Sequence, residues 1–142
     1  MHTPNEGAVL AAADAIIAAF AATDTEAYFA GFSEDATFVF HPEAARLNSR
    51  AEYEALWVDW VASGWRVTAC ESRDRLVQIF PGGAVFSHTV ATSIDSADGP
   101  DSYIERESIV FRVDDSDRLL AIHEHLSTVP DSSEPTEQES AS

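Results

Sequence analysis

Apolar residues recur at helical spacing in three segments of the chain. The pattern predicts an Ala-rich helix over residues 8–22 and a short second helix over residues 26–32. A third helix is predicted to begin after Ser49, an N-cap with Glu52 in the capping-box position, and to end at Ser63. The N-terminal part of the chain is therefore expected to be mainly helical.

The rest of the chain is rich in β-branched and alternating residues. Strands are predicted over residues 36–40, 65–80, 84–94, 101–113 and 118–127. Short turns join the last four segments, which favours hairpins and therefore antiparallel pairing. Strands this long must bend or twist strongly, so the expected fold is α+β: a strongly bent antiparallel sheet covered by three N-terminal helices.

The last predicted strand carries a carboxylate in an apolar row. Strict alternation places these residues on one face: Leu120, Ile122, Glu124 and Leu126. A buried carboxylate must be paired, hydrogen-bonded or protonated, because an unpaired buried charge is too costly to keep. Glu124 is therefore the first candidate for a general acid or base. The alternatives are a structural carboxylate bonded to a neighbouring His or Arg, or a surface residue at a sheet edge.

Charge and composition narrow the class of protein. The 142 residues indicate one domain, and the net charge of −17 makes nucleic acid and anionic membranes poor partners. No apolar run is long enough to span a bilayer and no signal peptide is apparent, so a cytoplasmic location is expected. The single Cys70 allows no internal disulfide. Residues 129–142 are acidic and lack apolar periodicity, so they are predicted to be a disordered tail after a domain spanning residues 1–128.

Two further groups are candidates for chemistry beside Glu124. Glu107 shares the proposed inner face, where it would form a coupled carboxylate pair with Glu124, or it pairs with an Arg instead. His88 lies in an apolar row, either as a partner in proton transfer or as a satisfied core residue. His123 and His125 have the spacing of a metal-chelating pair, but no third ligand is identified, so neither a metal nor another cofactor is expected.

The order of elements, with a last strand reading Ala-Ile-His-Glu-His-Leu-Ser, resembles the nuclear transport factor 2-like superfamily. The similarity is to its SnoaL-like branch, in which a last strand ending in His-x-His-x-Ser is frequent. It covers roughly residues 8–128. The superfamily includes ketosteroid isomerases, polyketide cyclases, dehydratases, epoxide hydrolases and the non-catalytic association domain of a calcium/calmodulin-dependent kinase. The resemblance implies a cone-shaped fold with an apolar pocket between sheet and helices.

On this resemblance the expected function is an isomerase, cyclase or dehydratase acting by carboxylate proton transfer on an apolar small molecule. The expected catalytic residues are Glu124, Glu107 and His88. The expected ligand-binding residues, several of which are equally explained as core, are Tyr28, Phe40, Tyr53, Trp57, Ile109, Ile122 and Leu126. A steroid isomerase carries an aspartate near the end of its first strand, whereas Phe40 and His41 stand there in this chain. The alternative is therefore a non-catalytic ligand-binding or dimerisation module.

Both faces of the last two strands carry apolar residues, and only one can face the helices. An uncovered apolar face is normally closed by another subunit, so a homodimer formed by the outer face of the sheet is expected.

Overall fold

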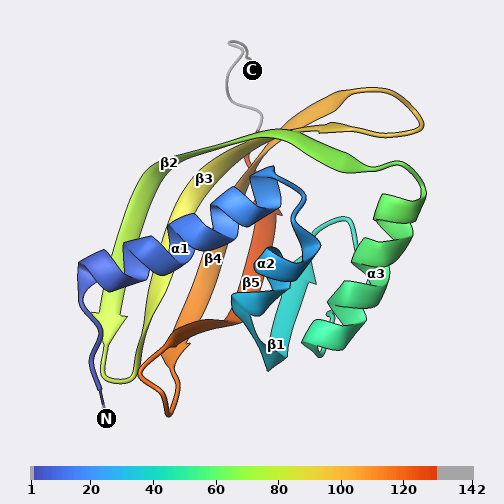
Figure 1. Ribbon diagram of the computed structural model, residues 1–142. Helices are drawn as coiled ribbons and strands as arrows, with labels where there is room; N and C mark the ends of the chain where they lie inside the picture. The colour runs from blue at the N-terminus through green and yellow to red at the C-terminus, as the bar shows by residue number, and fades with distance from the viewer. Residues whose placement is uncertain (1, 131–142) are drawn as a thin grey trace.

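The computed structural model describes residues 2–130 and contains three helices and five strands (Figure 1). In chain order they are α1 (Glu6–Ala21), α2 (Thr25–Ala30), β1 (Phe32–Phe40), α3 (Arg50–Ala62), β2 (Arg66–Phe80), β3 (Gly83–Asp95), β4 (Asp101–Val113) and β5 (Leu119–Thr128). The predicted tail, apart from its first two residues, lies outside the described residues.

The five strands form one curved sheet in the order β1-β5-β4-β3-β2. The hairpins of β2 to β5 pair antiparallel as predicted, whereas β1 pairs with β5 in parallel, so the sheet is mixed. Figure 1 shows α1 crossing the concave side of the sheet, with α2 beside it and α3 toward the β1 edge. The predicted α+β architecture, a bent sheet covered by three N-terminal helices, is confirmed.

Side-chain caps fix where the helices begin. Asn5, Asp24 and Ser49 each accept a hydrogen bond from a backbone N–H in the first turn of α1, α2 and α3. The carboxylate of Glu52 reaches back and accepts from the backbone N–H of Asn48, at 2.9 Å. The predicted start of the third helix is thus confirmed. None of the described helices has the length and apolar character needed to cross a membrane.

The strand β1 begins four residues earlier than predicted. Gly31 caps α2, and the buried Phe32, expected in the second helix, instead pairs with Ala121 of β5. The pairing shifts register between Phe32 and Thr37, and the polar residues between them resemble a turn in the sequence. A bulged edge strand therefore replaces the predicted turn.

A bulge in β5 changes which residues face the helices. Phe111 of β4 pairs with Ala121 and Val110 pairs with His123, so Ile122 is one residue too many. As a result Ala121 and Glu124, three positions apart, are both buried. The prediction that Ile122 shares the inward face with Glu124 is wrong, because strict alternation does not continue through a bulge.

Aromatic rings form the centre of the core between the sheet and the helices. Tyr28 stacks on Trp57 with their ring centroids 4.8 Å apart, and Phe38 packs edge-on against Tyr53 at 4.7 Å. Around this cluster the inner faces of β3 and β4 contribute further buried apolar residues. Tyr28 and Tyr53 of this core also line a cavity.

Candidate functional site

A cavity of about 320 Å³ opens between the concave face of the sheet and the three helices. Most of its wall is apolar, and the aromatic residues that line it are Phe20, Tyr28, Phe40, Tyr53, Trp60, Trp65 and Tyr103. A cavity of this size and lining suits an organic molecule rather than an ion or a polymer.

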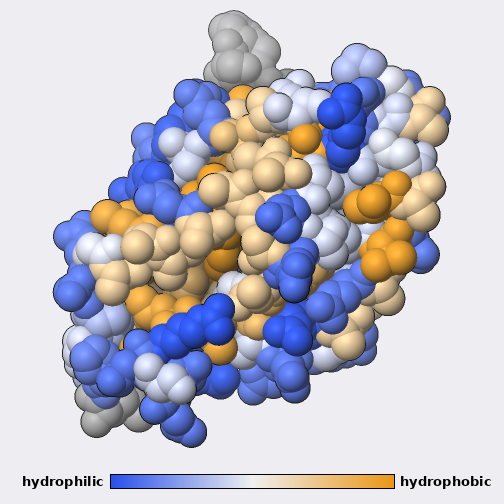
Figure 2. All heavy atoms as spheres, viewed as in Figure 1, coloured by the Kyte–Doolittle hydropathy of each residue, from blue (hydrophilic) through white to orange (hydrophobic). Residues whose placement is uncertain are grey.

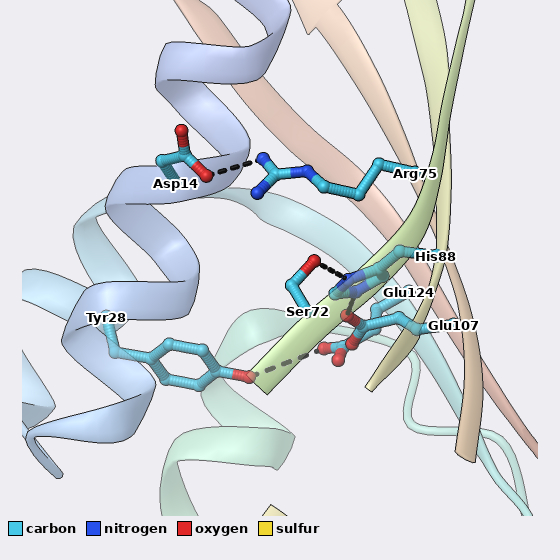
Figure 3. Close-up of polar contacts among 7 residues, drawn as sticks. All are labelled: Asp14, Tyr28, Ser72, Arg75, His88, Glu107 and Glu124. Atoms are coloured by element: carbon cyan, nitrogen blue, oxygen red, sulfur yellow. Dashed lines mark hydrogen bonds and ion pairs between the residues drawn. The ribbon is translucent and has the colours of Figure 1, made fainter. Parts of the chain in front are cut away.

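Four carboxylates interrupt this apolar wall. Glu107 and Glu124 lie in its deep part, and Glu105 and Glu43 lie near the loop that follows β1. Glu124 pairs with Ile109 and Glu107 pairs with Leu126, so the two carboxylates are diagonal neighbours on the inner faces of β4 and β5. Figure 3 shows their head groups next to each other.

His88 holds Glu107 from the neighbouring strand β3. Its Nε2 lies 2.5 Å from Glu107 Oε1, and its Nδ1 lies 2.6 Å from the Ser72 hydroxyl of β2. The side chain of His88 is fully buried. An ionised Glu107 only accepts, so Nε2 carries the hydrogen, and in the neutral ring Nδ1 accepts from Ser72. The three strands thus supply one connected chain of hydrogen bonds that ends at the cavity (Figure 3).

The environment shifts the pKa values of Glu107 and Glu124, the two deep carboxylates, in opposite directions. Burial, and then the charge of Glu107, raise the pKa of Glu124 well above its ordinary value. Burial alone would raise the pKa of Glu107 too, but hydrogen bonds with Glu124 and His88 lower it below the ordinary value. In the folded protein these shifts favour the protonated form of Glu124 and the ionised form of Glu107.

Two tyrosines bring their hydroxyls to the same place from the helices. The Tyr28 and Tyr53 hydroxyls lie 3.0 Å apart, and Tyr28 donates to Glu124 Oε1 at 3.4 Å. Burial, reinforced by the charge of Glu124, raises the pKa of both phenols well above 10.0, so both keep their protons. The hydroxyl pair is a neutral hydrogen-bond donor aimed at the carboxylate pair.

A second acid and base pair stands nearer the opening. His41 Nε2 lies 2.5 Å from Glu105 Oε2, and the side chain of His41 is 34% exposed against 9% for Glu105. Burial raises the pKa of Glu105, although the bond with His41 opposes this effect. Sequence reasoning missed this pair because 64 residues separate its members. The signal that was available was the inward alternation of Glu105 with Glu107 along β4.

The structure brings most of the expected site residues together. The cavity wall includes Tyr28, Phe40, Tyr53, Leu126, Glu107 and Glu124. His88 lies behind Glu107. The other expected ligand-binding residues are not among the described residues that line the cavity, and they are Trp57, Ile109 and Ile122.

Packing and pairing explain those three exceptions. Trp57 is fully buried behind Tyr28, and its Nε1 donates to Thr25 Oγ1 at 2.9 Å. Ile109 is buried in the core beside Glu124, and Ile122 is the surplus residue of the bulge.

The histidines of β5 take part in other contacts. His123 Nδ1 lies 2.8 Å from the Thr37 hydroxyl, and its ring centroid is 5.8 Å from that of His125. Within residues 2–130 no group of three or more His, Cys, Asp or Glu side chains is arranged to hold a metal ion.

The fold and this cavity define a class of small α+β proteins with a cone-shaped pocket. The model of the SnoaL-like domain matches residues 9–132, and the chain belongs to that family. No curated protein matches the chain.

Solved structures share the fold at low sequence identity. An NTF2-like protein from Cytophaga hutchinsonii has a TM-score of 0.75 at 14% identity, covering 89% of this chain and 100% of that one. A ketosteroid isomerase-like protein from Erwinia carotovora atroseptica has a TM-score of 0.73 at 16% identity, covering 89% and 99%. The CaMKII hub of S. rosetta has a TM-score of 0.72 at 19% identity, covering 91% and 100%. These similarities establish the nuclear transport factor 2-like fold.

Proposed function

We propose that this protein is an acid–base enzyme that moves a proton within an apolar small molecule, as an isomerase, cyclase or dehydratase. The observation that carries the proposal is the pair of neighbouring carboxylates Glu107 and Glu124 at the wall of an apolar cavity, where their surroundings shift the two pKa values in opposite directions. Pairs of carboxylates whose surroundings shift their pKa values in opposite directions are typical of acid–base sites.

Glu124 is the residue proposed to exchange its proton with the substrate. It lines the cavity and is only 4% exposed, so a bound molecule would meet it without intervening bulk water. In its ionised form it is a strong base, because burial and the neighbouring Glu107 charge both raise its pKa. In its protonated form it is an acid that can return the proton at another atom of the same molecule or transfer it to a leaving hydroxyl.

Glu107 and His88 are proposed to position and tune Glu124. When Glu124 holds the proton, Glu107 accepts from it, and the bond from His88 keeps Glu107 ionised. The Tyr28 and Tyr53 hydroxyls remain protonated and lie next to the same carboxylate. They are placed to donate to an oxygen on which negative charge develops as the substrate loses a proton.

Exchange of carbon-bound hydrogen tests this proposal without knowledge of the natural substrate. The protein is incubated in D₂O with a panel of cyclic ketones and β-hydroxyketones, and deuterium incorporation and dehydration are followed by NMR. We expect wild type to accelerate exchange of at least one member, and Glu124→Gln to lose about 100-fold of that acceleration. Exchange at the rate of the buffer for a ketone that saturates the cavity would contradict the proposal.

A second candidate function is a non-catalytic ligand-binding or dimerisation module. Phe40 supports it, because this buried side chain ends β1 where the aspartate of a steroid isomerase would be expected. The similarity to a structure described as a hub fits the same reading. Saturable binding of ketones with no exchange in wild type favours this candidate over the enzyme.

A further inference from the structure

The ionisable groups that line the cavity are mostly acids. Its wall carries four carboxylates and one imidazole, and no arginine is among the described residues that line it. The chain has no lysine at all. Arg50, Arg66, Arg75 and Arg112 instead form ion pairs with acidic residues outside the cavity. Apolar walls focus the field of the carboxylates into the cavity, so its interior favours a positive charge.

The aromatic part of the wall favours the same charge. Trp60 and Trp65 line the cavity with their centroids 5.4 Å apart, and Phe20 lies 6.2 Å from Trp65. The faces of aromatic rings attract cations, and tryptophan does so most strongly. Aromatic rings and carboxylates around one cavity are the combination that recognises alkylated ammonium groups.

The surroundings of Glu124 indicate independently that the cavity favours a positive charge. It is 4% exposed and lines the cavity. It accepts a hydrogen bond from Tyr28, which at 3.4 Å is long for a bond between hydroxyl and carboxylate, and its other hydrogen-bond neighbour, Glu107, is itself an acid. When ionised, this carboxylate is therefore short of positive partners. A positively charged group in the cavity would supply what the protein does not.

We propose that the ligand of this cavity is a hydrophobic organic cation, a protonated or quaternary amine on a hydrocarbon frame. The proposal concerns the same cavity as the proposed function and rests on its being a ligand site. The amine would lie among the carboxylates and rings, and the hydrocarbon frame would pack against apolar wall residues such as Ile16, Ile17 and Val90. A neutral hydrocarbon of the same shape would lose the charge interaction, and an anion would be repelled.

Two probes of equal shape separate charge from hydrophobicity. In phenyltrimethylammonium a nitrogen replaces the quaternary carbon of tert-butylbenzene, and this replacement adds one positive charge. Their binding is followed by tryptophan fluorescence, because Trp60 and Trp65 lie in the wall, and by calorimetry. We expect the cation to bind about tenfold more tightly than the hydrocarbon, the scale of cation–π contacts supported by a buried carboxylate.

Variants identify the charge responsible. A bound cation would favour the ionised form of Glu124, which glutamine cannot adopt, so Glu124→Gln is expected to weaken cation binding about tenfold and to change hydrocarbon binding by less than about twofold. Glu105→Gln, nearer the opening, tests the same charge effect if Glu124→Gln fails to fold. Glu71→Gln is the matched control, since Glu71 is exposed on β2 and is not among the lining residues. Both probes should bind to Glu71→Gln with the same affinity as to wild type.

Three results would overturn the proposal: equal or tighter binding of tert-butylbenzene, no binding of either probe, or an equal loss of cation affinity in Glu71→Gln. Tighter binding of the hydrocarbon would leave the acid–base proposal standing, because deuterium exchange tests that proposal separately. Cation binding without any exchange would support the cation site and favour the non-catalytic function.

Discussion

Glu124 links stability to chemistry, because its protonated form is favoured in the folded protein. Burial and the Glu107 charge raise its pKa, so the folded protein holds a proton that the unfolded chain releases above about pH 4.3. This group therefore lowers stability as pH rises from the unfolded pKa toward the folded pKa. The effect is about 1.4 kcal/mol for each pKa unit between the two states.

Glu124→Gln removes this titration while keeping shape and hydrogen bonding. We expect the variant to be more stable than wild type at pH 8 and closer to wild type at pH 5, in thermal melts at both pH values. Glu71→Gln, an exposed change of the same type, should show no such pH dependence. A variant less stable than wild type at pH 8 would mean that Glu124 is ion-paired and its pKa depressed.

His88 contributes to the stability of the fold through Glu107, whose pKa is lowered in the folded protein. A lowered pKa stabilises the fold above the unfolded pKa, and this stabilisation is lost as pH falls through the folded pKa. We therefore expect His88→Leu to destabilise by about 2 kcal/mol at pH 7, the scale of a lost bond to a charged group, and by less at pH 4. Denaturant titrations at the two pH values measure the difference.

Ser72→Ala is the control for that change. It leaves the His88–Glu107 bond in place and removes the Ser72 hydroxyl, so its effect should be about 1 kcal/mol or less. An equal loss for His88→Leu at pH 4 and pH 7 would show that His88 contributes packing and not charge.

At the scale of the elements, the β2–β3 hairpin depends on a close backbone approach at Gly83. A Cβ there would lie 2.2 Å from the Phe111 carbonyl oxygen and 2.9 Å from the Phe80 ring. We expect Gly83→Ala to destabilise by about 2 kcal/mol, because backbone of β4 would have to move. Chemical denaturation measures the change.

Gly7→Ala provides the comparison in the first turn of α1. Its Cβ would lie in ordinary contact with Asn5 Oδ1, at 3.4 Å, and alanine is the better helix former, so a gain of up to about 1 kcal/mol is expected. A neutral Gly83→Ala would mean that the hairpin can shift to accommodate a methyl group.

Local sequence patterns predicted those elements that local rules govern. Capping residues and helical periodicity placed α3, and alternation put Glu105 and Glu107 on one face because β3 and β4 pair without a register shift. The same rule failed on β5, where a bulge depends on pairing with β4 and leaves no local mark. The His41–Glu105 contact and the parallel β1–β5 pairing join distant segments, so only the folded chain reveals them.

At the scale of the whole molecule, the uncovered side of the sheet remains the basis for expecting a homodimer. Val85 and Val110 pair across β3 and β4 and point away from the helices, between residues that are buried in the core. Figure 2 shows that the opposite side also carries an apolar band, over the Ala-rich α1. The sheet face is the better candidate for self-association, because its valines are only half-buried.

We expect light scattering to give a mass of about twice 15.4 kDa at micromolar concentration. Val110→Arg should shift the mass toward the monomer, since an unpaired charge would be buried in the interface. Val58→Arg, on the exposed side of α3, should not. A wild-type mass near 15.4 kDa would argue against the dimer.

The bulge at Ile122 also bears on how related chains are aligned. Ala121 and Glu124 both face inward although three positions separate them, which a regular strand does not allow. A relative with a regular last strand needs one residue fewer to present the same two side chains. An alignment that is anchored at Ala121 and forbids gaps within strands would then match its inward carboxylate to His123, and the carboxylate corresponding to Glu124 would be overlooked.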